Sequence, residues 1–168
     1  MPTVDHLTYQ AKLRISFTIT AVVCVLDFAL KIWAQNNLPA YNKYFFILSE
    51  PHSPFLTYTT NPNLTAGLPF NPLIVVGVIA IFLSTFIFAY HSRGLLPILA
   101  CGLVWAIILA NGLERILTGV GIDYLGFILP FNLGVVCIVN LADLAGLTGM
   151  LLLFFCTLRP TRFGALRF

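Results

Sequence analysis

Charged side chains are scarce in this chain of 168 residues: Asp, Glu, Lys and Arg make up 9% of it, and only six residues are acidic. Apolar residues account for 59%, and the mean hydropathy is +0.94. A water-soluble domain usually has about a quarter of its residues charged, so this composition excludes one. The chain is therefore expected to be a membrane protein.

Histidine and cysteine are few as well, and neither is arranged for metal or redox chemistry. The three histidines lie in the N-terminal tail and in loops, without the spacing of zinc ligands: His6, His52 and His91. The four cysteines each lie inside an apolar run without CxxC spacing, as small core residues do: Cys24, Cys101, Cys137 and Cys156. We therefore expect no metal, no disulfide and no cofactor.

Four apolar stretches are long enough to cross the hydrocarbon core of a membrane, which takes about 20 apolar residues as a helix. They are residues 15–35, 72–91, 94–116 and 132–157. No stretch remains for a water-soluble domain, so we expect one all-α membrane domain over residues 1–168. Because only residues 91–94 separate the second and third spans, these two helices are expected to be antiparallel neighbours.

Residues 36–71 are too polar, and too rich in Pro and Asn, to form a span. They nevertheless contain aromatic and β-branched residues in YFFIL (44–48) and FLTYTT (55–60), with turn-forming residues between and after them. Two interpretations stay open for this segment. It is either a small strand-bearing lobe on the outer membrane surface or an irregular connecting loop.

Basic residues are concentrated on one side of the predicted spans. Six of the nine Lys and Arg lie before the first span, between the second and third, or after the fourth: Lys12, Arg14, Arg93, Arg159, Arg162 and Arg167. The positive-inside rule places this side in the cytoplasm, so both termini are expected there and segments 36–71 and 117–131 face outward. These ends explain the net charge of +3, so membrane lipids and not nucleic acid are the expected partners.

The first span contains two charged residues of opposite sign, Asp27 and Lys31. Residues four apart lie on the same face of a helix, so their side chains can pair within the outer half of the span. Lys31 can also extend its ammonium group toward the interface. We interpret the two residues as a structural pair that orients the helix, in preference to a catalytic role.

Two further acids lie in or beside the apolar runs, Glu114 near the end of the third span and Asp143 within the fourth. A carboxylate at membrane depth costs on the order of 2.5–3.5 kcal/mol, so it is normally paired or functional. Asn111 and Asn140 each lie three residues before one of these acids and can hydrogen-bond to it. If the two carboxylates face each other they share a proton, as in aspartic proteases. The alternative is that Glu114 pairs with Arg115 while Asp143 binds backbone or lipid.

Five short motifs that contain these polar residues follow one another along the chain. They are Asp27 and Lys31 in D-x-x-x-K spacing, Asn61 in NPNLTAGL (61–68), Asn111, Glu114 and Arg115 in ANGLER (110–115), Asp123 in GVGIDYL (119–125), and Asn140, Ala142 and Asp143 in VNLAD (139–143). In this order they resemble the motifs of the lipoprotein signal peptidase (signal peptidase II) family, which are four-span aspartic proteases. The resemblance covers residues 15–157.

The resemblance implies a protein of the bacterial cytoplasmic membrane with a small outer lobe after the first helix. It also implies that Glu114 and Asp143 are the catalytic pair, with Glu114 where the family motif G-N-x-x-D-R has Asp. The residues that it implies as supporting the pair are Asn111, Arg115, Asn140, Asp123 and Asn61.

Two functional hypotheses follow from the resemblance. Glu is one methylene longer than Asp, and a misplacement of about 1 Å can cost about a hundredfold in rate. The motif at 61–68 also departs from the family's N-x-G-x-A-F-G-L. These departures favour a catalytically degenerate member that acts as an accessory or scaffold subunit beside other integral membrane proteins. The alternative is an active aspartic endopeptidase that cleaves signal peptides from lipid-modified prolipoproteins.

Overall fold

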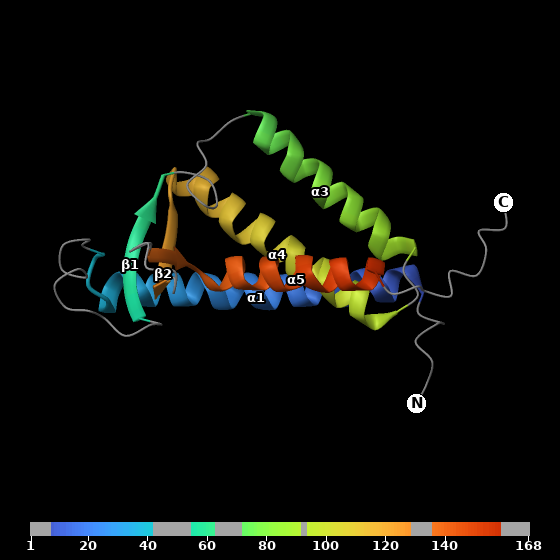
Figure 1. Ribbon diagram of the computed structural model, residues 1–168, viewed down its shortest axis with the longest axis horizontal. Helices are drawn as coiled ribbons and strands as arrows, with labels where there is room; N and C mark the ends of the chain where they lie inside the picture. The colour runs from blue at the N-terminus through green and yellow to red at the C-terminus, as the bar shows by residue number, and fades with distance from the viewer. Residues whose placement is uncertain (1–7, 42–54, 63–71, 92–93, 129–135, 159–168) are drawn as a thin grey trace.

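The computed structural model describes residues 8–41, 55–62, 72–91, 94–128 and 136–158 (Figure 1). Within these ranges the helices are α1 (Tyr9–Asn37), α3 (Pro72–His91), α4 (Leu95–Thr118) and α5 (Leu141–Leu158). The strands are β1 (Phe55–Asn61), β2 (Gly121–Ile128) and β3 (Val136–Val139). Each of the four helices is long and apolar enough to cross a membrane. The expected fold class, four spans with a small strand-bearing lobe after the first, is confirmed.

The sheet is larger than the sequence predicted. All three strands are antiparallel, in the order β1-β2-β3, and two of them lie outside the 36–71 segment. The strand-bearing interpretation of FLTYTT is therefore confirmed, whereas YFFIL lies outside the described residues. The expected loop at 117–131 contains β2 instead. The short strand β3 has the sequence VCIV, whose β-branched side chains favour extended backbone.

The bounds of two spans also differ from the prediction. The first helix begins at Tyr9, where the Thr8 side chain accepts a hydrogen bond from the amide of Ala11 at 3.3 Å, and it continues to Asn37. The last helix begins at Leu141 and not at residue 132, because β3 occupies part of the same apolar run. An apolar run read alone does not separate a buried strand from the start of a helix.

The sheet lies at one end of the helix bundle, and the start of α1 and the end of α5, the described segments nearest the chain termini, lie at the other (Figure 1). Helix α4 ends where Gly119 adopts a left-handed φ of 77°, and the chain then enters β2 within two residues. Helix α5 begins directly after β3. The end of α4, the middle of β2 and the start of α5 are thereby brought to the same end of the bundle.

Helices α1, α4 and α5 pack closely, while α3 diverges from them toward the sheet end (Figure 1). In the half of the bundle near the termini, the Ser16 hydroxyl donates to the carbonyl of Ile98 and the Thr20 hydroxyl to the carbonyl of Gly102, both at 2.9 Å. The residue numbers increase together along both helices, so α1 and α4 are parallel. A Cβ at Gly102 would lie 2.7 Å from the carbonyl oxygen of Ser16, so the two backbones approach closely here.

The largest fully buried side chain in the described residues is that of Trp105, in the middle of α4. Its indole N–H donates to the hydroxyl of Thr85 on α3 at 2.9 Å, which satisfies the polar end of the ring. Its ring packs against Phe82 and Phe86 of α3 and against Phe17 of α1. This apolar cluster joins α3 to the rest of the bundle. In the described part of the chain, the buried charged side chains lie at the sheet end.

Candidate functional site

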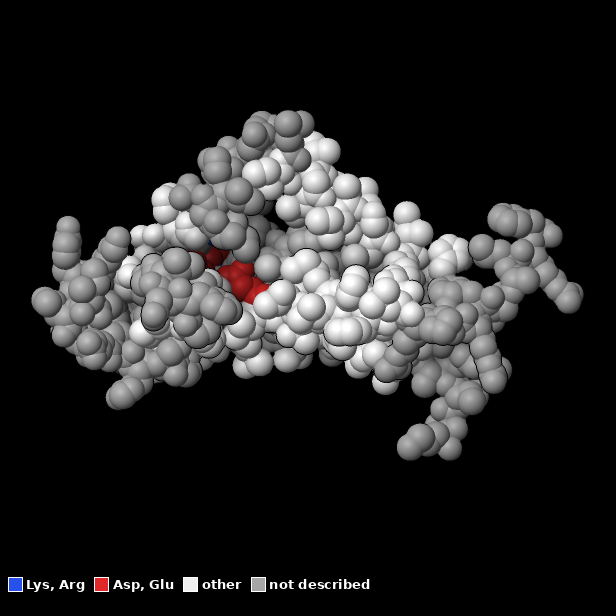
Figure 2. Space-filling view, viewed as in Figure 1, with Lys and Arg blue, Asp and Glu red and all other residues white. Residues whose placement is uncertain are grey.

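A buried cluster of polar side chains occupies the sheet end of the bundle. Its members come from four elements, α1, α4, β2 and the start of α5: Asp27, Lys31, Asn111, Glu114, Asp123, Tyr124, Asn140 and Asp143. All of them except Asp143 are buried, and Asp143 is partly exposed. Acidic atoms are visible in Figure 2 near the sheet end, so part of this cluster is accessible from outside the protein.

Lys31 is the cation at the centre of one half of the cluster. Its ammonium nitrogen lies 2.8 Å from a carboxylate oxygen of Asp27, one helical turn earlier, and 2.8 Å from Oε2 of Glu114 on α4. It also donates to the side-chain oxygen of Asn111 at 2.9 Å. Its hydrogen bonds go to Glu114 and Asn111, whereas the contact with Asp27 is an ion pair whose oxygen accepts no hydrogen bond within the described residues. The spacing of Asp27 and Lys31 predicted their common face, but not the contact with Glu114.

Glu114 connects this ion cluster to the sheet. The oxygen that contacts Lys31 also accepts a hydrogen bond from the backbone N–H of Ile122 at 3.1 Å. Ile122 immediately precedes Asp123 in β2, so Glu114 holds the backbone that carries Asp123. The neighbouring Arg115 lies against β2 as well, because a Cβ at Gly121 would be 2.7 Å from its guanidinium group.

Asn140 is hydrogen-bonded to two acids, Asp123 on β2 and Asp143 in the first turn of α5. Its amide nitrogen lies 2.8 Å from Oδ1 of Asp123 and 3.1 Å from the side-chain oxygen of Asn111. Its side-chain oxygen accepts from the backbone N–H of Asp143 at 2.9 Å, and its own backbone N–H donates to Oδ2 of Asp143 at 3.2 Å. This reciprocal pair of bonds is a capping box, which fixes the side chain of Asp143 at the beginning of the helix.

Asp143 is held from a second side by Asn111. The amide nitrogen of Asn111 donates to Oδ1 of Asp143 at 2.9 Å, while its oxygen accepts from Lys31 and Asn140. Both carboxylate oxygens of Asp143 therefore have a donor. The side chain remains partly exposed, which leaves room for a water or a peptide group to approach.

The pKa of Asp123 shows the electrostatic relation between the acids. Burial, followed by the negative charge of Asp143, raises the pKa of Asp123 from 3.8 to about 6. Hydrogen bonds from Asn61 and Asn140 and the charge of Arg115 lower the same pKa, and burial outweighs them. Asn61 reaches the carboxylate from β1 at 3.4 Å. Asp123 and Asp143 thus lie close enough for one charge to change the ionisation of the other group.

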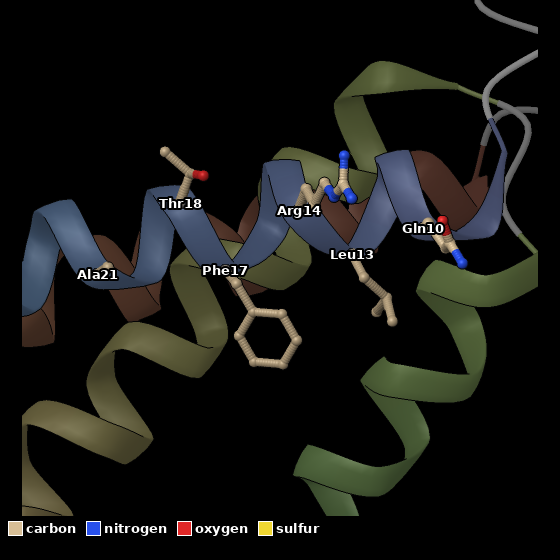
Figure 3. Close-up of a pocket in the computed structure, with 6 residues that line it drawn as sticks. All are labelled: Gln10, Leu13, Arg14, Phe17, Thr18 and Ala21. Atoms are coloured by element: carbon tan, nitrogen blue, oxygen red, sulfur yellow. The ribbon is translucent and has the colours of Figure 1, made fainter.

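A surface hollow near the termini is separate from this cluster. It has a volume of about 590 Å³, and six residues of α1 line it: Gln10, Leu13, Arg14, Phe17, Thr18 and Ala21 (Figure 3). Arg14 and Asp27 are separated by more than three helical turns, roughly 20 Å at 1.5 Å per residue. The acidic cluster at the sheet end is the candidate for acid–base chemistry, because the residues that line the hollow include no acid.

The structure brings the polar residues of the motifs into one cluster. Within it, the contacts of the acids differ from the expected pairing of Glu114 with Asp143. Glu114 contacts Lys31 and the backbone of β2, whereas Asp123 and Asp143 are both bonded to Asn140. The role of Glu114 and Asp143 as a catalytic pair therefore stays a prediction. Tyr124 was not among the predicted site residues, although a tyrosine hydroxyl beside an acid in an apolar run was the available signal.

The comparisons with known proteins agree with this architecture. The sequence profile of the signal peptidase (SPase) II family matches residues 19–159. Among solved structures, one described as a bacterial membrane enzyme has a TM-score of 0.67 at 21% identity, over 87% of this chain and 94% of that one. A second, also described as a bacterial membrane enzyme, has a TM-score of 0.61 at 20% identity, over 85% and 87% of the two chains. No curated protein sequence matches.

Four apolar helices with a small sheet and a buried acidic cluster at one end define the class of this protein, a multi-pass membrane protein with the fold of a bacterial membrane enzyme. The chain belongs to the signal peptidase II family.

Proposed function

We propose that this protein is an active aspartic endopeptidase that cleaves signal peptides from lipid-modified prolipoproteins, with Asp123 and Asp143 as its catalytic carboxyl groups. The single observation that carries this proposal is that Asn140 donates hydrogen bonds to both acids, from its side-chain amide to Oδ1 of Asp123 at 2.8 Å and from its backbone N–H to Oδ2 of Asp143 at 3.2 Å. Burial, followed by the charge of Asp143, raises the pKa of Asp123 to about 6, which favours a protonated Asp123 beside an ionised Asp143, the arrangement that aspartic proteolysis uses.

In this proposal the two carboxyl groups have different roles. Asp143 is partly exposed and accepts two hydrogen bonds, so it is the carboxylate that takes a proton from water. As that proton leaves, the water oxygen bonds to the peptide carbonyl carbon, and protonated Asp123 gives its proton to the carbonyl oxygen. Asp143 then returns its proton to the amide nitrogen as the C–N bond breaks, while Asp123 takes a proton from the hydroxyl that collapses to the new carboxyl group.

This proposal changes the role of Glu114. The ion pair with Lys31 and the hydrogen bond from Ile122 make it a positioning residue for β2. The substitution of Glu for the family's Asp at this position then affects a residue beside the catalytic pair and not a member of it. One oxygen of Glu114 contacts both the ammonium group of Lys31 and the backbone N–H of Ile122.

The second candidate is the catalytically degenerate accessory subunit. The observations that favour it are the departures from the family motifs at Glu114 and in segment 61–68, most of which lies outside the described residues. In that case other integral membrane proteins are the partners, and the cluster at the sheet end is structural.

A cleavage assay separates the two candidates. Purified protein is incubated with a diacylglyceryl-modified prolipoprotein, and the loss of the signal peptide is followed as a shift on a gel. We expect the wild type to cleave, and Asp123→Asn and Asp143→Asn each to lower the rate by about 10²–10⁴-fold, because an amide can neither take nor give the proton. Glu114→Asp should keep more cleavage activity than either Asp→Asn variant. An inactive wild type that Glu114→Asp activates would overturn this assignment in favour of Glu114 as the altered catalytic residue.

We also propose the location expected from the basic residues: a bacterial cytoplasmic membrane, with both termini in the cytoplasm and the sheet end outside. This places the cleavage site on the face where exported prolipoproteins emerge. The test is labelling of His52→Cys in a cysteine-free background with a reagent that does not cross membranes. Labelling of intact spheroplasts supports the orientation, and labelling only after the membrane is opened contradicts it.

A further inference from the structure

Tyr124 is a buried residue of β2 to which the proposed reaction gives no role. Its side chain is 5% exposed, and it follows Asp123 directly in the strand. The hydroxyl oxygen accepts a hydrogen bond from the backbone N–H of Leu141 at 2.9 Å, and the hydroxyl donates to Oδ1 of Asp27 at 3.3 Å. One hydroxyl group therefore links β2, α1 and the first residue of α5.

The bond to Leu141 belongs to a complete set at the start of α5. The first N–H groups of a helix have no partner within the helix and need other acceptors. Here the N–H of Leu141 donates to Tyr124, that of Ala142 to Oδ1 of Asp27 at 3.2 Å, and that of Asp143 to the side chain of Asn140 at 2.9 Å. Three side chains from three places in the sequence thus fix the turn that carries Asp143.

The hydroxyl also connects this turn to the buried ion pair. Oδ1 of Asp27 receives both the Tyr124 hydroxyl and the N–H of Ala142, while its other oxygen lies 2.8 Å from the ammonium group of Lys31. Burial and the charge of Asp27 raise the pKa of Tyr124, so the hydroxyl keeps its proton and remains a donor. Without it, a buried N–H and a buried carboxylate each lose a partner.

We propose that Tyr124 is a positioning residue for Asp143: its hydroxyl fixes the first turn of α5 and thereby the place of the catalytic carboxylate. The inference rests on the proposed function for its effect on cleavage. Its structural part, the bond from Leu141 to the Tyr124 hydroxyl, can be tested without activity. Phe has the same ring but no hydroxyl, so Tyr124→Phe removes these two hydrogen bonds and little packing.

The experiment compares Tyr124→Phe with Tyr90→Phe, a matched change at an exposed tyrosine at the far end of α3. Two quantities are measured on full-length protein in nanodiscs. The first is amide hydrogen exchange at residues 141–143, which should become about fivefold faster at Leu141 in Tyr124→Phe alone. The second is the kinetics of prolipoprotein cleavage, where kcat should fall by about 5- to 30-fold while KM changes by less than about twofold.

Each outcome decides the proposal. Faster exchange at Leu141 together with a lower kcat and an unchanged KM supports it. Unchanged exchange, unchanged kcat, or a loss of activity that only follows a loss of folded protein overturns it. If the wild type does not cleave at all, the proposed function fails by itself. The exchange at Leu141 then decides whether Tyr124 fixes the start of α5.

Discussion

The two halves of the α1–α4 pair are held together in different ways. Near the termini, Ser16 and Thr20 donate to backbone carbonyls of α4, and Gly102 lets the helices approach closely. At the sheet end the same two helices are joined by charged side chains, with Lys31 bonded to Glu114 and Asn111. One half uses small residues and backbone, and the other uses a buried ion cluster.

The two kinds of contact affect the protein differently: one mainly joins the helices, and the other mainly fixes the positions of side chains. Small residues and hydroxyl groups give many weak contacts that are each replaceable, worth about 0.6 kcal/mol on average for a hydrogen bond between membrane helices. A buried ion cluster loses much of its attraction to desolvation, yet removal of one partner is strongly destabilising. The half near the termini therefore joins the helices, while the sheet end fixes the positions of Asp123 and Asp143.

The largest effect is expected for Lys31→Met. The change leaves the carboxylates of Asp27 and Glu114 buried without their cation, so the free energy of unfolding should fall by about 3–5 kcal/mol. Unfolding in mixed micelles with increasing SDS measures it. Lys12→Met is the control, because Lys12 donates to the carbonyl of Tyr90 at an exposed position near the termini. If both variants lost the same free energy of unfolding, the buried ion cluster would contribute no more to stability than an exposed lysine does.

The stability of the sheet end should depend on pH through Asp123. The pKa of Asp123 is about 6 in the folded protein and near 3.8 when unfolded, so the folded state binds this proton more tightly. Its contribution to stability is therefore complete below pH 4 and is lost as pH rises through 6, a change of about 3 kcal/mol.

Asp123→Asn removes this titrating group and should flatten the fall in unfolding free energy between pH 4 and 7. Thr20→Val, a change in the other half of the bundle, should leave the slope as it is in the wild type. The measurement is the unfolding free energy across this pH range for all three proteins. A slope in Asp123→Asn as steep as that of the wild type contradicts the assignment.

A smaller effect is expected at the close contact near the termini. In Gly102→Ala the new Cβ would lie 2.7 Å from the carbonyl oxygen of Ser16, so the helices must move apart, at about 1–3 kcal/mol. Gly112→Ala on the same helix meets nothing within 4 Å and should be neutral or stabilising by up to about 1 kcal/mol. Thermal unfolding of the two variants compares them directly. Similar melting temperatures would mean that the backbones do not approach at Gly102.

The smallest effect is expected for Thr20→Val, which removes the hydroxyl that donates to the carbonyl of Gly102 and keeps the shape of the side chain. The free energy of unfolding should fall by about 0.6 kcal/mol and by no more than about 1.7. The same SDS titration measures it, with Thr18→Val at an exposed position of α1 as the control. A loss as large as that of Lys31→Met would remove the distinction between the two halves.

Much of the fold followed from local pattern. Apolar runs of sufficient length predicted four membrane helices, and the motif order predicted the family. The strand at Phe55–Asn61 was one of two open interpretations, and the strands β2 and β3 were missed. β3 lies in the apolar run of the fourth span, and strand pairing with β2 is what separates it from the helix.

The sequence by itself determined which residues lie on a common helical face, because the 3.6-residue period of a helix is a local property. It placed Asp27 beside Lys31 and Asn140 beside Asp143 on these grounds. Only the tertiary structure decided which acids work together. Glu114 pairs with Lys31, which is 83 positions away in the sequence. Asn140 is hydrogen-bonded to Asp123, which is 17 positions away on another element. Such contacts depend on how α1, α4, β2 and α5 pack, and no spacing along one segment contains that information.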